Sequence, residues 1–568
     1  MPGAGRGAAR AIVPAAFLPR PMRLAPLLVL LAAAPVFAQP LPGTCRLGVD
    51  EDSLTAGDVR AVVFNTGSLF FGNTTTAGDG YIVPKGTGRS PVFAAGLWIG
   101  GTVRGELRLA AATYAGYNFW SGPLGADARP ADPSDCSPYD RIYTVSRGDI
   151  SDYYATGRAA DDLRDWPWRL GAPVLDGDGI ADNYSLAGGD QPAIRGDQTA
   201  WWLMNDVGGP HAINATPPLG VEVRVEAFAL ARRPLAQTTF YRYTFTNRTA
   251  EAVDSVYVSL FVDPDLGSSV DEYTGTDTTN GMGYTYNADN ADAVYGIPPA
   301  IGFQVVEAPV RYASGRDADE AAGEAGERLG MTSSMLFFST AGPSGDPATG
   351  IGRYFFMKGR YADGSVMRES GNGYEQTHGN VTTFMFAGDP VTNRAWNEPN
   401  PGVGLPPIQP GDHRILVSTG PFRLGPGQSE TVTFAVPFAQ GTSNLNSVTR
   451  LRGLAAAVRA VTRAGAFEPV AVERPDDGAP TDLVRLSAPS PSPFTVRTVV
   501  RYEAPAGTLL RATLHDVLGR RVAVVHDGPT TTTAGEIAVD GRGLAPGTYL
   551  LRVRVPAGER VVTLVRTR

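Results

Sequence analysis

Five carboxylates lie in one short loop of this chain, directly after a stretch with the pattern of a β-strand. Apolar residues alternate through 256–262, and Pro264, which has no N–H for a β-ladder, follows at once. The carboxylates are Asp263, Asp265, Asp271, Glu272 and Asp277. Two carboxylates held ~4 Å apart repel by roughly 4 kcal/mol at an effective dielectric of 20, and a cation would turn this cost into a gain. We therefore predict a Ca²⁺ site here; a carboxylate pair for acid–base catalysis and a solvated loop are the alternatives.

A second acidic loop reads DGDGIAD: Asp176 and Asp178 alternate with glycines, and Asp182 follows four residues later. Acids at every second position are typical of the first half of a calcium loop. No glutamate stands at the twelfth position, so the loop is not an EF-hand. The pattern predicts a second Ca²⁺ site, with a solvated Asp-Gly hairpin as the alternative.

Motifs for nucleophilic or metal-dependent catalysis are missing from the sequence. It contains no HExxH, GxSxG, P-loop or CxxC pattern, and its five histidines are scattered. We therefore predict no catalytic residue and leave open whether the chain is an enzyme. Four of the seven tryptophans, at positions 166, 168, 201 and 202, could stack on sugar rings, although core packing is the commoner role.

The composition indicates an all-β protein. Gly (68) and Pro (46) are abundant among the 568 residues, and 43% of the chain is hydrophobic. Such a mixture is typical of many turns between strands. The net charge of −8 argues against nucleic acid as a partner, because nucleic-acid binding needs a basic footprint.

The pattern of strands and linkers divides the chain into five segments. Residues 1–38 have the basic start, apolar core and small-residue cleavage site of a signal peptide, with Met22 as the expected true start. We predict an aromatic-rich β region at 39–214, a β-sandwich region at 215–470, a linker at 471–485 and a compact module at 486–568. These are tandem antiparallel sandwich-like regions with one amphipathic helix, at 445–464. No later run is apolar enough for a membrane helix.

Two local features add to this division. Cys45 and Cys136 are the only cysteines, and an exported protein would allow them to form a disulfide, with two buried thiols as the alternative. The strand pattern at 92–101 ends in Gly100 and Gly101, and this glycine pair predicts a tight turn.

Four motifs in order mark the C-terminal module. They are Pro-x-Pro-Phe, a Leu-x-Asp-x-x-Gly-Arg turn, Gly-Leu-x-x-Gly-x-Tyr and a short closing strand. The matching residues are Pro493, Phe494, Asp516, Gly519, Arg520, Gly543, Leu544, Gly547 and Tyr549. The module resembles the type IX secretion system C-terminal sorting domain (type A), with Ser492 where that family usually has Asn. The resemblance implies an Ig-like β-sandwich that the outer-membrane translocon reads before the domain is removed or exchanged.

The body resembles an uncharacterised family of surface proteins that carry this sorting domain. The matching stretches include 93–101, 195–206, 263–279 and 411–427. This resemblance implies delivery through the periplasm to the outer cell surface or medium, and it transfers no activity. The favoured interpretation is a structural or adhesive, calcium-stabilised protein. A polysaccharide-active hydrolase and a non-catalytic glycan-binding protein are the alternatives, and either would make surface polysaccharide a partner.

Overall fold

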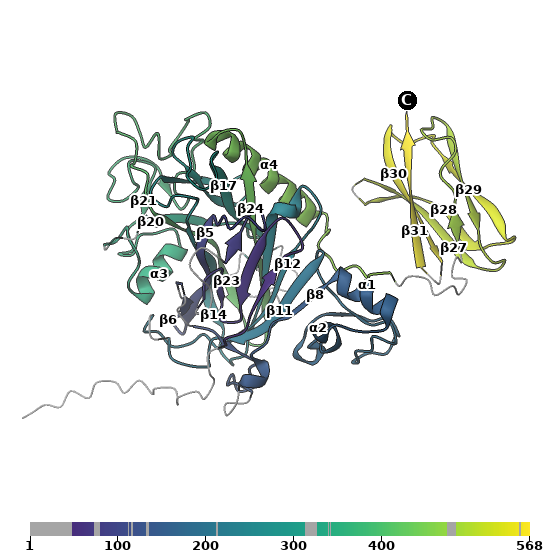
Figure 1. Ribbon diagram of the computed structural model, residues 1–568, viewed down its shortest axis with the longest axis horizontal. Coiled ribbons are helices and arrows are strands. Elements are labelled where there is room, and N and C mark those ends of the chain that lie inside the picture. The colour runs from purple at the N-terminus through teal and green to yellow at the C-terminus, as the bar shows by residue number, and fades with distance from the viewer. Residues whose placement is uncertain are drawn as a thin grey trace, which may run out of the picture. The chain divides into compact units, whose positions relative to one another are not determined.

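The computed structural model describes residues 48–567 apart from 73–79, 112, 115–117, 132–135, 212–213, 313–325, 339, 341, 474–483, 518 and 556–557. The expected signal peptide, Cys45 and most of the expected linker lie outside the described residues. The described part is mostly β, as predicted, with antiparallel pairing throughout its named sheets (Figure 1). Within it, no helix has both the length and the apolar character needed to cross a membrane.

Two large sheets form the body. Sheet one runs β1 (Glu51–Leu54), β2 (Arg60–Phe64), β3 (Ser68–Leu69), β5 (Val92–Val103), β14 (Val253–Pro264), β23 (His413–Leu424) and β20 (Ser333–Phe338), with β4 (Tyr81–Ile82) on β2 and β6 (Glu106–Ala111) on β5. Sheet two runs β15 (Glu272–Asp277), β16 (Met282–Asn287), β17 (Pro299–Glu307), β24 (Ser429–Gln440), β13 (Thr238–Asn247), β12 (Val221–Ala229), β11 (Gln198–Asn205) and β7 (Trp120–Ser121), with β8 (Tyr143–Ser146) on β11.

Short elements connect and cover these sheets. Three small two-stranded ladders are β9 (Val174–Leu175) with β10 (Gln191–Pro192), β18 (Val310–Arg311) with β19 (Glu327–Arg328), and β21 (Met367–Arg368) with β22 (Val381–Thr382). The described α-helices are α1 (Arg147–Thr156), α2 (Asp161–Arg164), α3 (Gly350–Met357) and α4 (Asn444–Arg463).

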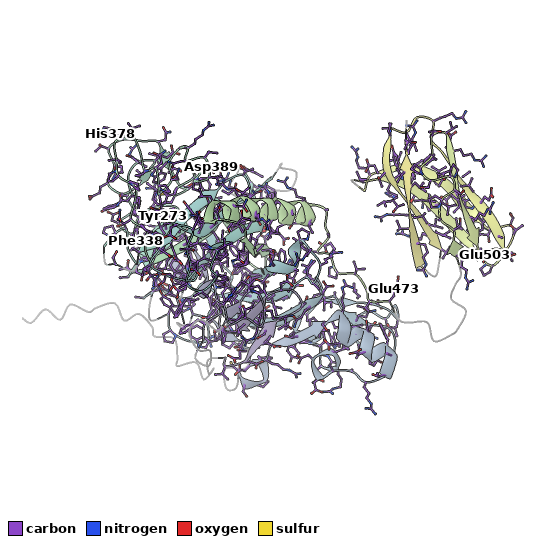
Figure 2. The ribbon with its side chains drawn as sticks, turned by 45° about the horizontal axis from the view of Figure 1, so that its top comes forward. Tyr273, Phe338, His378, Asp389, Glu473 and Glu503 are labelled. Carbon is purple, nitrogen blue, oxygen red and sulfur yellow. The ribbon has the colours of Figure 1, made fainter. Side chains whose placement is uncertain are left out.

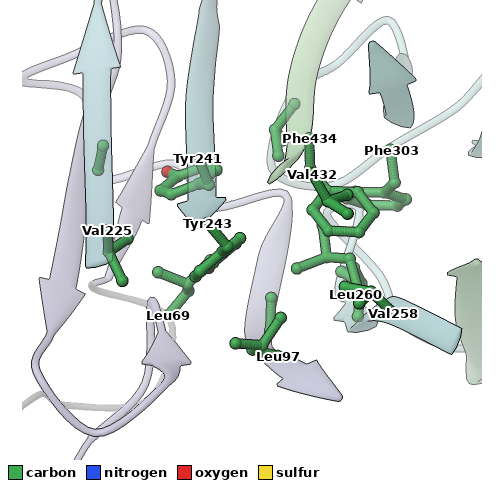
Figure 3. Packing of buried hydrophobic residues seen from close by; sticks show 14 of the residues in the cluster. Leu69, Leu97, Val225, Tyr241, Tyr243, Val258, Leu260, Phe303, Val432 and Phe434 are labelled. Carbon is green, nitrogen blue, oxygen red and sulfur yellow. The ribbon is translucent and has the colours of Figure 1, made fainter. Parts of the chain in front are cut away.

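Strand β14 contributes to two different cores because its side chains alternate between faces. Val258 and Leu260 point into the space between the sheets and lie beside Phe303, Val432 and Phe434 (Figure 3). On the opposite face, the Phe261 ring stacks on Trp98 with centroids 5.7 Å apart and also packs near Phe337. Helix α3 closes this outer layer through Phe356, whose ring lies 5.2 Å from that of Phe337. Each large apolar side chain that is fully buried contributes roughly 1.5–3 kcal/mol.

The expected boundary between residues 214 and 215 does not separate two sandwiches. Strand β5 comes from the first expected region and pairs with β14 from the second, with Leu97 opposite Leu260. Likewise β11 pairs with β12, with Ala200 opposite Ala227. Both regions therefore contribute strands to both sheets, and residues 48–473 hold one two-sheet body. Local alternation reveals strands but not which distant strand each one pairs with.

The turn expected at Gly100 and Gly101 is wrong, because β5 continues to Val103 and turns at Arg104 and Gly105. The glycines instead allow close approach. A Cβ at position 100 would lie 2.5 Å from Leu109 Cδ1, and one at position 101 would lie 2.7 Å from Val253 Cγ1.

The predicted amphipathic helix is confirmed as α4, which packs on β16, β17 and β24 of sheet two. Its buried face includes Val448, Leu451 and Val458. The Ser443 side chain accepts a hydrogen bond from the Asn446 N–H at the start, and Gly465 adopts a left-handed φ of 67° just beyond the end.

The C-terminal module is a seven-stranded β-sandwich with its own core. One sheet runs β25 (Arg485–Leu486), β26 (Arg497–Glu503) and β29 (Ala534–Asp540). The other runs β28 (Arg521–Pro529), β27 (Leu509–Asp516), β30 (Gly547–Val555) and β31 (Gly558–Arg566). Buried residues from both sheets, among them Val500, Leu514 and Leu551, make the core. This agrees with the expected Ig-like sandwich.

The motif residues of this module have local structural roles. The Asp516 carboxylate accepts hydrogen bonds from the Arg520 N–H at 3.0 Å and Nε at 2.8 Å, closing a turn in which Gly519 has a φ of 77°. Phe494, which follows Pro493, is 2% exposed in the core. The Tyr549 hydroxyl donates to the Ala545 carbonyl at 2.8 Å. The remaining motif residues, Gly543, Leu544 and Gly547, belong to the segment that leads into β30, where both glycines have positive φ and Leu544 packs on the core.

Candidate metal centre

Three carboxylates converge where β14 ends and β23 begins. Asp263 is the penultimate residue of β14, Asp265 follows the strand, and Asp412 immediately precedes β23. Because β14 and β23 are antiparallel neighbours, with Val262 opposite Ile415, the end of one strand lies beside the start of the other. One oxygen from each carboxylate lies within 4.8 Å of the other two. At an effective dielectric of 20, two charges at this distance repel by about 3.5 kcal/mol.

Arg414 is the cation already present in this group. Its Nη1 lies 2.7 Å from Asp412 Oδ1, and its Nε lies 3.2 Å from Asp263 Oδ1. The same Nε donates to the Tyr114 hydroxyl at 3.1 Å. Asp265 has no hydrogen-bond or ion-pair partner for its carboxylate within the described part of the chain. One guanidinium therefore faces three carboxylates, and the group keeps an excess of negative potential.

Two of these carboxyl groups, Asp263 and Asp265, have raised pKa values. Burial raises the pKa of Asp263 to about 7, although the Arg414 guanidinium acts in the opposite direction. Burial also raises the pKa of Asp265 to about 6, and the charge of Asp412 is the next cause. Carboxyl groups with such pKa values bind protons near neutral pH unless a cation replaces those protons.

Glu272, the first residue of β15, lies next to the three aspartates and is fully buried. Its Oε1 accepts a hydrogen bond from the Leu266 N–H at 2.8 Å, while its Oε2 is buried and, among the described residues, has no hydrogen-bond donor. Burial raises the pKa of Glu272 well above its ordinary value, and repulsion from Asp265 and Asp263 acts in the same direction. A buried carboxylate oxygen without a donor is an available ligand atom beside the cluster.

A second buried pair, Glu398 and His413, adjoins this group, because His413 stands between Asp412 and Arg414 in the chain. His413 Nδ1 is 3.8 Å from Glu398 Oε1, and both side chains are fully buried. Neither ring nitrogen of His413 has a hydrogen bond within the described residues. Burial lowers the pKa of His413 to about 3, so the ring is neutral. Phe338 packs edge-on against this ring and Tyr273 borders Glu398; both are labelled in Figure 2.

The five acids expected to form one cage do not all meet. Asp271 instead accepts a hydrogen bond from Asn287 Nδ2 at 3.0 Å, and Asp277 accepts from Asn280 Nδ2 at 2.7 Å. The reason is that β15 starts at Glu272 and carries Asp277 along sheet two, away from the end of β14. The structure keeps Asp263 and Asp265, places Glu272 beside them and adds Asp412, which lies 147 residues further along the chain than Asp265.

The second predicted loop is a hairpin between β9 and β10 in which Asp176, Asp178 and Asp190 come together. Asp182 is not part of this group and adopts a left-handed φ of 61°. Asp190 is buried, but its two oxygens accept hydrogen bonds from the N–H groups of Gly177 at 2.9 Å and Ser185 at 2.6 Å. The carboxylate that sequence reasoning missed thus closes the hairpin, and the case for an ion is weaker here than at Asp263.

Three of the four tryptophans that could have stacked on a sugar ring are buried in the core. Trp166, Trp201 and Trp202 are 2%, 1% and 1% exposed, so they are core residues that cannot stack on a sugar from solvent. Trp168 is only half-buried, and the Arg169 guanidinium lies over its ring. Within the acidic group, Asp263 is 3% exposed, whereas Asp265 and Asp412 are half-buried. Cys136 is disulfide-bonded and buried beside Trp120, while Cys45, its expected partner, lies outside the described residues.

Comparisons with known proteins give no family. No family model matches the chain, and no curated protein matches it. Among solved structures, a polysaccharide lyase aligns with a TM-score of 0.19 and 9% identity over 69% of this chain. The aligned part spans only 38% of that protein. A TM-score of 0.19 is too low to indicate a common fold, so the metal centre and the sandwich are interpreted from their own geometry.

Proposed function

We propose that this chain is an exported, structural or adhesive β-sandwich protein whose body is stabilised by a divalent cation, Ca²⁺, at Asp263, Asp265 and Asp412. The observation that carries the proposal is the convergence of these three carboxylates beside the buried, unpaired Oε2 of Glu272. A structural ion would be held where the chain leaves sheet one and enters sheet two. It would stabilise the folded body by mass action, because the unfolded chain has no such site.

Calcium fits the donor set better than a transition metal does. The converging atoms are all carboxylate oxygens, and Ca²⁺ prefers oxygen ligands in flexible arrangements. The neighbouring His413 is not one of the three converging residues. Arg414 would remain beside the ion as a counter-charge for Asp412, the carboxylate with which it makes its shorter contact.

Export is the second part of the proposal. The signal-peptide pattern at 1–38 and the ordered motifs at 493–549 support delivery by the type IX secretion system, with the outer-membrane translocon as the partner. The C-terminal module is a β-sandwich, and the resemblance implies an Ig-like sandwich, so its fold supports this part of the proposal. The final location would be the cell surface or the medium.

The direct test is metal content and its dependence on the proposed ligands. After equilibration with CaCl₂ and removal of free metal, elemental analysis should find calcium in the full chain. Asp263→Asn combined with Asp412→Asn should abolish the calcium held at this site. The matched control is Asp176→Asn with Asp178→Asn, which removes two charges from the other acidic loop and should leave this calcium in place. Unchanged calcium content in the first double variant would refute the site.

A further inference from the structure

The C-terminal module has a charge opposite to that of the rest of the chain. Residues 484–568 contain twelve arginines and six acidic residues, a net charge of +6, whereas the whole chain carries −8. The body that precedes the module is therefore strongly acidic. A concentration of one sign of charge on a small domain attracts ligands of the opposite sign.

Much of this positive charge is on one face of one sheet. A cavity of about 210 Å³ is lined by Arg511, Thr513, His515, Arg521, Arg552 and Arg554. These residues are cross-strand neighbours on β28, β27 and β30: Arg511 is opposite Arg554, Thr513 is opposite Arg552, and His515 is opposite Arg521. Among the side chains that the structure describes, no carboxylate lines this cavity.

The core fixes this arrangement. Leu510, Ala512 and Leu514 alternate with the three lining residues of β27 and are 1%, 0% and 1% exposed on the opposite face. A shift of one residue would place these apolar side chains in water, so the register holds the arginines together. Like charges directly opposite in an antiparallel pair are destabilising. Folding of the sheet thus places Arg511 directly opposite Arg554, and an anion bound between them would favour this pairing.

One described acidic side chain outside the cavity lining contacts Arg511. Arg511 forms a 3.5 Å ion pair with Asp527, and both side chains are about half exposed, at 52% and 58%. Such an exposed pair contributes roughly 0–1 kcal/mol. Glu559 is the register partner of Arg554 on the neighbouring strand β31. The four lining arginines offer positive charge and paired N–H donors to a phosphate monoester, whose charge is about −1.5 to −2 at pH 7.

The polar residues of the cavity are hydrogen-bonded to their neighbours. The Gly519 carbonyl can only accept, so His515 Nδ1 donates to it at 3.0 Å. The Thr513 hydroxyl lies 3.0 Å from His515 Nε2. These contacts hold the ring in place and tie the cavity to the Asp516–Arg520 turn. Guanidinium groups bind phosphate oxygens through paired N–H donors.

We propose that this cavity is a phosphate-binding site of the C-terminal module. The ligand would be a phosphate monoester, either on a lipid headgroup or on a soluble sugar phosphate. The site is independent of the calcium centre, because all its residues lie in the other sandwich. A monocarboxylate has one charge and two acceptor oxygens, fewer than a phosphate monoester, so it should bind more weakly.

The test uses the full chain and two probes. Binding of glucose 6-phosphate is measured by calorimetry, with glucose and glucuronate as controls. Binding to vesicles of phosphatidylcholine, with and without phosphatidic acid, is measured by flotation. The double substitution Arg511→Gln with Arg554→Gln should weaken phosphate binding at least tenfold. The matched control, Arg497→Gln with Arg501→Gln on β26 of the other sheet, removes the same charge and should bind like the wild type.

The outcomes separate the sources of the phosphate. Loss of glucose 6-phosphate binding in the cavity variant supports a soluble ligand, and loss of vesicle binding alone supports a lipid headgroup. Equal weakening in both double variants would mean a diffuse charge effect and would overturn the site. Binding of no probe, or binding of glucuronate as tight as that of glucose 6-phosphate, would also overturn it. Arg511→Lys with Arg554→Lys, which keeps the charge, should retain intermediate affinity and shows that the module still folds.

Discussion

Substitution of Asp265 by asparagine separates a metal site from an ordinary ion-pair cluster. Asp265 is the member of the acidic group whose carboxylate has no hydrogen-bond or ion-pair partner among the described residues, so the change removes a charge without breaking a contact. In the absence of metal, the variant loses its repulsion from Asp263 and Asp412. In the presence of calcium, it lacks one of the three ligands. The variant should therefore be more stable than the wild type without calcium and less stable with it.

The size of both effects follows from simple estimates. Two repulsions of about 3.5 kcal/mol each set an upper bound, and partial protonation near a pKa of about 6 reduces the gain without metal to roughly 1–3 kcal/mol. Calcium at a hundred times its Kd stabilises the wild type by about 2.7 kcal/mol. Unfolding a body of roughly 420 residues has an entropy of about 0.9 kcal/mol/K, so these energies correspond to Tm shifts of roughly 1–3 °C.

Tryptophan fluorescence is the appropriate readout, because all seven tryptophans lie between residues 98 and 396 and none in the C-terminal module. Thermal unfolding is followed in EDTA and in saturating CaCl₂. Asp271→Asn is the matched control from the same loop, since Asp271 contacts Asn287 rather than the cluster. This control variant should keep the full increase in Tm that calcium causes in the wild type. If Asp265→Asn also kept the shift, or if it lowered Tm equally in EDTA and calcium, the proposed role of Asp265 would be wrong.

Three further predictions follow from the same structure. Calcium binding should release protons and become tighter between pH 5 and 8, because Asp263 and Asp265 have pKa values of about 7 and about 6 and must be ionised to bind the ion. Without metal, the free energy of unfolding should fall as pH rises from about 4 to about 7, by up to about 1.4 kcal/mol per pH unit for each proton. Calorimetry in buffers of different ionisation enthalpy counts the protons, and a count of zero at pH 6 would contradict the prediction. Trp201→Ala should destabilise the body by about 3–5 kcal/mol in denaturant unfolding, because the ring is 1% exposed; loss of glycan binding at unchanged stability would contradict this. Cys136→Ser should lower the free energy of unfolding by about 2–4 kcal/mol, because it removes the disulfide. A reductant should lower the unfolding midpoint of the wild type to that of the variant and leave the midpoint of the variant unchanged.

The local hydrophobic pattern is sufficient to predict those strands and helices whose own residues show a clear periodicity. The alternation of valine with charged residues predicts β12, and the structure places that strand at Val221–Ala229. The apolar stripe and the following glycine predict α4 to within a residue at each end. For β14 the alternation predicts two faces, but not that both are buried, because the outer face is covered by α3, about 90 residues further along the chain.

The metal centre could be predicted only in part, because its members come from distant strand ends. Asp263 and Asp265 stand together in the sequence, but Asp412 joins them only through the pairing of β14 with β23. Asp271 and Asp277 are close to these residues in the sequence, but the course of β15 takes them away from the metal centre, so their prediction as ligands is wrong. Helix α1 was missed although Ser146 and Asp149 form a capping box, a signal that a search for Ser-x-x-Asp would have found.

The position of the acidic group explains why a cation there would matter to the whole body. The chain crosses from sheet one to sheet two between Pro264 and Glu272, and this crossing is tied at both ends. The Leu266 N–H donates to the Glu272 side chain at 2.8 Å, and the Gly411 N–H, just before β23, donates to the Glu272 carbonyl at 3.1 Å. Asp263, Asp265 and Asp412 surround the same crossing. Because β14 is central in sheet one and packs on both faces, an ion at its end would stabilise a strand on which both hydrophobic layers depend.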